Sequence, residues 1–351
     1  MKLGIFFKFL AVLLIFCLLS TTLISCTKRS YTEYNFDYFD TLTTIIGYAS
    51  NRNAFDSVSE RVLDMLERYH KLFDIYHSYA GMNNLYTLNH ERGSAQSPIK
   101  VEPEIIELIE FAKDCYVKTD GYVNIAMGSV LSLWHTQRTL ASKNPSKAKL
   151  PDEAALVSAS AHTDISKVII DKESCTAYLA DSEMTLDVGA IAKGYAVERI
   201  AKALEADGIS GYVLNVGGNV RTVGSMPDGS PWPVGIDNPD SNDKENAYIA
   251  TLGLSGEAIV TSGTTQRYYV YNGVKYHHII DKDTLYPAEG YLSVSIISKD
   301  SGVADALSTA LFCTDVEQGR EILSRFSGVE AVWVCTDGNV YYSDGFADFC
   351  S

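Results

Sequence analysis

The sequence predicts a single α+β domain in which helices pack on a mixed or antiparallel sheet. Three observations support this fold class. Apolar residues recur at helical spacing in the first half of the chain, short strand-like runs bounded by turn residues dominate the second half, and neither a repeat nor a Pro- or Gly-rich linker divides the two. With 351 residues, 46% of them hydrophobic, the chain suffices for one large core.

The helices are predicted from apolar periodicity. The clearest are amphipathic segments over 55–73 and over 105–116, and the second follows Pro103, a residue typical of a helix start. Further helices are expected over 127–135, near Asp152, over 190–206 and over 302–326, with a polar surface loop over 139–149.

The strands are predicted from short β-branched and aromatic runs. Asn272-Gly273 is the strongest turn signal in the chain and predicts a tight hairpin. The expected hairpins are 167–171 with 176–180 and 267–271 with 274–280, and single strands are expected over 212–216, 291–298 and 331–335.

The charge balance argues against nucleic acid as a partner. The chain carries 29 Lys and Arg against 44 Asp and Glu, a formal net charge of −15. Binding to a phosphate backbone needs a surplus of cations that displace counterions, which this composition does not supply.

The N-terminus has the features of a bacterial lipoprotein signal. Lys2 and Lys8 precede an apolar run over 9–19 that is too short to span a bilayer. The following Leu23-Ile24-Ser25-Cys26 resembles a lipobox. The sequence therefore predicts a signal peptide over 1–25, a tether over 26–36 and a domain over 37–351. The protein would be extracytoplasmic, on the periplasmic side, and attached to the cytoplasmic membrane by a lipid on Cys26. The alternative is an ordinary secretory signal with a coincidental cysteine.

A segment rich in small residues precedes the predicted helix over 190–206. Asp187 is expected to cap this helix, and the small residues after it would let a phosphate approach the backbone, with Lys193 supplying a positive charge. Small residues at a helix start also serve packing, so both interpretations remain open.

Two further segments carry chemistry-bearing side chains. His277 and His278 are adjacent on a predicted strand and must face opposite sides, so only one can enter a given pocket, and either can be purely structural. Asp305 and Thr309 lie one turn apart on a predicted apolar helix. Their oxygen atoms suit Mg²⁺, although a buried hydrogen-bonded pair would explain them equally well.

Taken together, these segments resemble the ApbE family, the FAD:protein FMN transferases. The resemblance covers about 39–312, and the matching segments, in order and at fitting spacing, are 187–197, 215–219, 260–263, 278–281 and 304–310. It implies a T-fold-like domain that takes FAD as substrate with Mg²⁺ as cofactor. Family members break the pyrophosphate of FAD, join FMN through a phosphoester to a Thr or Ser hydroxyl of a target protein, and release AMP.

The resemblance also implies roles for individual residues. His278 would be the base for the incoming hydroxyl, since an imidazole has a pKa near ~6.5. Mg²⁺ would be held by the backbone carbonyl of Ala190 with Asp305 and Thr309. Residues expected to contact FAD are Phe39, Asp74, Ile75, Tyr76, Asn124, Ile125, Ala126, Asp187, Lys193 and Ile279.

Three functions remain open from the sequence. The first is FMN transfer to flavoprotein subunits of membrane redox complexes. The second is FAD pyrophosphatase activity, in which water replaces the acceptor hydroxyl and the products are FMN and AMP. The third is a flavin-binding lipoprotein without catalytic activity.

Overall fold

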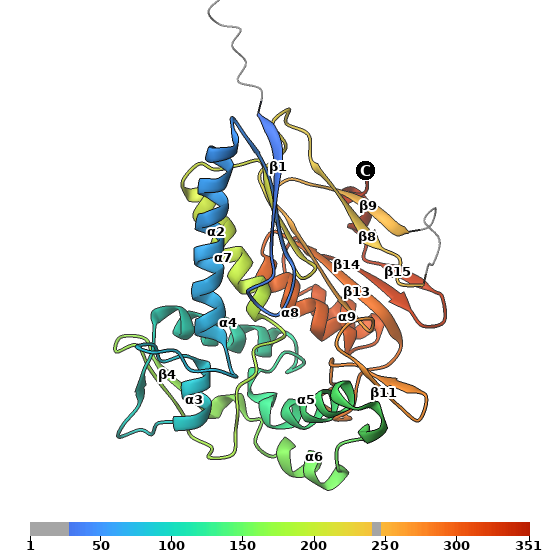
Figure 1. The fold of residues 1–351 in the computed structure, drawn as a ribbon. Coiled ribbons are helices and arrows are strands. Elements are labelled where there is room, and N and C mark those ends of the chain that lie inside the picture. Colours follow the sequence, from blue (N-terminus) through green and yellow to red (C-terminus); the bar gives the residue numbers. More distant parts are fainter. Residues whose placement is uncertain (1–27, 241–246) are drawn as a thin grey trace, which may run out of the picture.

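An eight-stranded sheet forms the frame of the protein in a computed structural model that describes residues 28–240 and 247–351 (Figure 1). Every pair of neighbouring strands is antiparallel. The order across the sheet is β1 (Arg29–Asn35), β2 (Thr43–Ala49), β6 (Tyr212–Val216), β7 (Asn219–Val223), β10 (Ala258–Gly263), β13 (Tyr291–Ser298), β14 (Glu330–Cys335) and β15 (Val340–Tyr342). The predicted α+β class with an antiparallel sheet is confirmed.

Helices cover one face of this sheet. The main core contains Val260, Ile296 and Trp333 from the strands, together with the apolar side chains of helix α8 (Ser301–Phe312), nearly all of whose residues are buried. The helices on this face are α2 (Arg52–Phe73), α7 (Ala192–Ala206), α8 (Ser301–Phe312) and α9 (Val316–Leu323). Figure 1 shows α2 beside α7, and α7 also packs against α8.

A hairpin of β8 (Trp232–Asp237) and β9 (Tyr248–Leu254) covers part of the opposite face. Ile236 and Leu252 of the hairpin form a second core with Ile259, Ile297 and Val332 of the sheet. Since neighbouring residues on a strand point to opposite faces, Ile259 belongs to this core while Val260 belongs to the main one.

Smaller elements form the lower part of the molecule in Figure 1. The elements are α3 (Leu85–Glu91), β3 (Ile99–Lys100), α4 (Pro103–Lys118), α5 (Gly128–Lys143), α6 (Glu153–Ser160), β4 (Val168–Asp171), β5 (Thr176–Leu179), β11 (Tyr269–Tyr271), β12 (Val274–Tyr276) and the 3-10 helices Ile125–Met127, Pro145–Lys147 and Ile165–Lys167. A further 3-10 helix, Phe346–Phe349, lies instead against β9 and β14. Trp134 joins helix α5 to the β11–β12 hairpin, because its ring packs against Tyr269 and Tyr276 of that hairpin. Its Nε1 also donates to the carbonyl of Leu285 at 2.9 Å.

Several predicted boundaries are wrong. Residues 29–35, assigned to the tether, form β1 and pair with β2, so the folded part begins earlier than expected. The helix over 127–135 continues as α5 to Lys143 through the expected loop, because no Gly or Pro interrupts it before Pro145 and Ala141 is buried. The helix over 302–326 is two helices, since Asp315 caps α9 through the amide of Gln318.

The predicted signal peptide and lipobox, including Cys26, lie outside the described residues. Within the described ranges, no helix is long and apolar enough to cross a membrane.

Candidate active site

A cavity of about 920 Å³ brings together nearly all of the predicted site residues. Its walls come from the inner strands β2, β6, β7, β10 and β13 of the main sheet, the β8–β9 hairpin, the N-terminal end of α7, α8, α5 and loops between them. The predicted residues that line it are Phe39, Asp74, Ile75, Tyr76, Asn124, Ile125, Asp187, Ala190, Lys193, His278, Ile279, Asp305 and Thr309. Ala126 is the exception. It is fully buried behind the wall, where its amide donates to Asn124 Oδ1 at 2.9 Å and closes the turn that starts the 3-10 helix.

Asp187 does not cap α7, contrary to the sequence prediction. Its Oδ1 accepts from the amide of Gly189 at 2.8 Å, which closes a turn five residues before the helix begins at Ala192. Ile191 occupies the N-cap position and makes no side-chain cap bond. Burial raises the pKa of Asp187, and the Gly189 amide opposes that rise.

Asp305 takes over the capping role from a distant helix. Its Oδ2 accepts from the amide of Gly194 at 2.8 Å, across 111 residues of sequence. In a regular helix this amide would donate to the carbonyl oxygen of Ala190, four residues earlier. Within the described residues nothing donates to that carbonyl, which leaves it free on the cavity wall.

The Asp305 carboxylate is only partly compensated. The side chain is 6% exposed, and Lys193 Nζ lies 3.8 Å from its Oδ2, beyond hydrogen-bond distance. Burial raises the pKa of Asp305, and Lys193 and the Gly194 amide oppose the rise. Thr309 lines the same cavity one turn further along α8. The structure therefore brings one carboxylate, one hydroxyl and one free carbonyl to the same cavity.

The two adjacent histidines have different surroundings, as the alternation argument predicts. His277 is buried, with Nε2 2.8 Å from the carbonyl oxygen of Ala288 and Nδ1 accepting from the amide of Ile279 at 3.2 Å, so both ring nitrogens have backbone partners. His278 lines the cavity, and its buried Nδ1 has no partner among the described residues. His277 is structural, while His278 is available for chemistry.

The pKa of His278 departs from the ordinary value assumed from the sequence. Burial lowers it to about 3, and the positive charges of Arg267, Arg138 and Lys193 contribute. The imidazole is consequently neutral at physiological pH.

Asp74 organises the loop that carries Tyr76. Burial tends to raise the pKa of Asp74, but donors from the backbone and from side chains outweigh burial and lower it. These donors are the amides of Tyr76 and His77, the His77 ring and the Tyr79 hydroxyl, at 2.6 to 3.1 Å. Tyr76 is 52% exposed and lines the cavity, and its ring centroid lies 5.3 Å from that of His135.

Two arginines in the cavity wall were not predicted as site residues. Arg138 Nη2 lies 3.0 Å from His135 Nδ1, and Arg267 Nη2 donates to the carbonyl oxygen of Phe39 at 3.5 Å. Among the described residues neither has a carboxylate within 4.0 Å. Arg138 was missed because its helix was predicted to end at residue 135.

Comparison with known proteins identifies the family. A sequence profile of the ApbE family matches residues 36–333. A FAD:protein FMN transferase from Klebsiella pneumoniae (strain 342) is 31% identical over 289 residues, which are 82% of this chain and 85% of the relative. Another, from Treponema pallidum (strain Nichols), is 32% identical over 278 residues, 75% of this chain and 74% of the relative.

Solved structures show the same fold. The ApbE protein of Thermotoga maritima superposes with a TM-score of 0.79 at 28% identity, covering 92% of this chain and 100% of the other. The flavin transferase ApbE from Vibrio cholerae gives a TM-score of 0.74 at 22% identity over 92% of this chain and 99% of its own. The profile match, the relatives and the shared fold together establish that this chain belongs to the ApbE family.

Proposed function

We propose that this protein is a Mg²⁺-dependent FAD:protein FMN transferase that joins FMN to a Thr or Ser hydroxyl of an acceptor protein and releases AMP. The observation that carries the proposal is the cavity in which a buried, incompletely compensated carboxylate, a lysine and a neutral histidine meet. The relatives named FAD:protein FMN transferase support the same activity.

The residues around Asp305 fit a magnesium ion. Mg²⁺ takes oxygen ligands and usually binds through one or two carboxylates, completed by water and substrate phosphate. Asp305, Thr309 and the free carbonyl of Ala190 are such ligands, and within the described residues no group of three or more His, Cys, Asp or Glu side chains offers an all-protein metal cage. When bound, the ion would neutralise phosphate charge during transfer.

Lys193 and His278 would act directly on the reactants. Lys193, whose Nζ lies 3.8 Å from Asp305 Oδ2, would hold a phosphate oxygen. His278, which lines the same cavity, would accept the proton of the attacking hydroxyl at a ring nitrogen. A diphosphate in the cavity adds negative charge, which favours the imidazolium and raises the pKa of His278 from its low value in the free protein. Substrate binding would thereby make His278 a better base.

A lipid on Cys26 would hold the protein on the periplasmic side of the cytoplasmic membrane, near flavoprotein subunits of membrane redox complexes. The signal-like N-terminus supports this placement.

The test uses the mature protein with FAD, Mg²⁺ and a candidate FMN-binding domain of a membrane redox complex. Mass spectrometry should show the acceptor gaining one FMN, with one AMP released per acceptor. AMP release without a gain in acceptor mass would indicate FAD hydrolysis. FAD binding without AMP release would indicate a non-catalytic flavin-binding protein.

A further inference from the structure

We infer that Glu198 is a positioning residue that controls the Mg²⁺ affinity of the site by joining α7 to α8. This inference rests on the proposed function, because it concerns the cation held near Asp305. Glu198 lies on α7, on the side facing the sheet, and it does not line the cavity.

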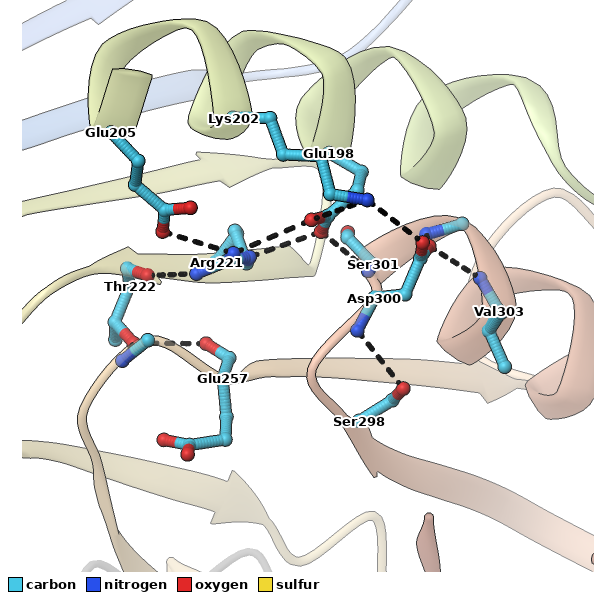
Figure 2. Close-up of polar contacts among 12 residues, drawn as sticks. Glu198, Lys202, Glu205, Arg221, Thr222, Glu257, Ser298, Asp300, Ser301 and Val303 are labelled. Carbon is cyan, nitrogen blue, oxygen red and sulfur yellow. Dashed lines mark hydrogen bonds and ion pairs between the residues drawn. The ribbon is translucent and has the colours of Figure 1, made fainter. Parts of the chain in front are cut away.

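The Glu198 carboxylate connects three elements (Figure 2). Its Oε2 accepts from Arg221 Nε at 3.0 Å and from the amide of Ser301 at 2.8 Å, and Oε1 accepts from Arg221 Nη2 at 3.4 Å. Ser301 is the first residue of α8, and Arg221 lies in β7. One side chain of α7 therefore fixes both the start of α8 and the adjacent strand.

This connection reaches the proposed metal ligands through α8. Asp305 lies one turn after Ser301, and its carboxylate accepts from the amide of Gly194 on α7. The Ser301 hydroxyl also bonds to Asn219 Oδ1. A sliding movement of α8 along α7 would break the Ser301 and Gly194 bonds together, so the contacts of Glu198 and of Asp305 define one helix register.

The energetics favour a positioning role over a purely stabilising one. Glu198 and Arg221 are each 3% exposed, and a buried ion pair loses so much hydration that an apolar pair of similar size is often as stable. An apolar pair could fill the space, but it could not accept the hydrogen bond from the Ser301 amide. That directional bond is what the charged pair adds.

The test compares three variants of the full chain. The double variant Glu198→Leu/Arg221→Met removes both buried charges, which avoids leaving one of them unpaired, and it leaves the Ser301 amide without its acceptor. Glu198→Gln keeps an oxygen that can accept from this amide. The control Glu205→Gln removes the negative charge of a different partner of Arg221, 3.0 Å away, that makes no bond to Ser301.

Two quantities are measured. The first is the affinity for Mn²⁺ alone, determined by electron paramagnetic resonance. The second is the Mg²⁺ concentration that gives half-maximal AMP release from FAD. The double variant should weaken both about 10- to 100-fold, as expected when the groups that orient metal ligands are lost. FAD binding in metal-free buffer should change less than about twofold, on the same reasoning. Glu198→Gln should recover most of the affinity, and Glu205→Gln should match the wild type.

A folded double variant with wild-type values in both readouts overturns the inference, as does an equal loss in Glu205→Gln. Failure of the wild type to bind Mn²⁺ and to depend on Mg²⁺ overturns it as well. If the wild type binds Mn²⁺ but neither transfers FMN nor releases AMP, the proposed function fails while the Mn²⁺ series still decides the role of Glu198.

Discussion

Replacing Gly194 by Ala should destabilise the protein and lower the Mg²⁺ affinity of the site, although Ala is the better helix former. A Cβ at this position would lie 2.9 Å from Asn219 Nδ2, and closer still to the carbonyl oxygen of Ser301 and the Cβ of Asp305. The backbone contact cannot be relieved by rotating a side chain, so α7 and α8 must move apart. Their separation would stretch the 2.8 Å bond from the Gly194 amide to Asp305.

The net effect follows from two opposing contributions. Ala in place of Gly within a helix stabilises by about 0.8–1.0 kcal/mol. Overpacking a well-packed contact costs about 1–3 kcal/mol, and a clash with backbone places this site near the upper end. The free energy of unfolding should therefore fall by roughly 2 kcal/mol.

Urea denaturation measures this loss, and the Mg²⁺ dependence of AMP release measures the effect on the site. Gly189→Ala is the matched control on the same cavity wall, because its added Cβ would meet only Asp187 Oδ1 at 3.1 Å. A Gly194→Ala protein that is more stable than the wild type, with unchanged Mg²⁺ dependence, would show that helix propensity dominates and that the close helix contact is unimportant.

Four other expectations concern the base, the metal and the anchor. His278→Ala should slow FMN transfer by about 10²–10⁴-fold and retain FAD binding; wild-type turnover would make His278 structural. The pKa of His278 is about 3 in the folded protein and about 6.5 in the unfolded chain, so on acidification the unfolded chain binds the proton first. The free energy of unfolding of substrate-free wild type should therefore fall between pH 6.5 and 3 more steeply than that of His278→Leu. Equal slopes, measured by urea denaturation at each pH, would contradict this. Asp305→Ala should abolish both FMN transfer and FAD hydrolysis, measured as AMP release. Thr309→Ala should lose less activity, and excess Mg²⁺ should partly restore it. Mg²⁺-dependent AMP release by Asp305→Ala would place the metal elsewhere. Cys26→Ala should leave the membrane fraction or stay unprocessed, as membrane fractionation would show; a cleaved, membrane-bound mutant would refute the lipid anchor.

The helices could be predicted from sequence better than the strands at one side of the sheet. Helix α2 repeats apolar residues on one face over six turns, a signal that tertiary contacts reinforce. In β2, by contrast, the buried face includes Thr43 and Gly47, and Gly47 is required because the ring of Tyr212 occupies the space of a side chain. Small and polar residues on the buried face conceal the alternation that identifies a strand. The edge strand β1 is mostly polar and shows no alternation.

The cavity residues could be named from family resemblance, but their contacts could not. The sequence placed Asp187 as the cap of α7 because it precedes the helix at a plausible distance. The structure gives that role to Asp305, which is remote in sequence and becomes a neighbour only when α8 packs on α7. Capping by a distant side chain leaves no local pattern, so periodicity and spacing cannot find it. The low pKa of His278 likewise depends on Arg138 and Arg267, which come from separate elements.

Helices α7 and α8 each carry a buried carboxylate, and the negative charges of the two are balanced to different degrees. Glu198 is matched by Arg221 and by the Ser301 amide, so its charge is neutralised and its geometry fixed. Asp305 receives one amide and a lysine at 3.8 Å, which leaves its charge only partly balanced. A buried carboxylate whose charge is not fully balanced lowers stability. An underbalanced carboxylate beside a free carbonyl is instead stabilised when a cation binds, and the balanced pair keeps the helices in register while that cation is absent.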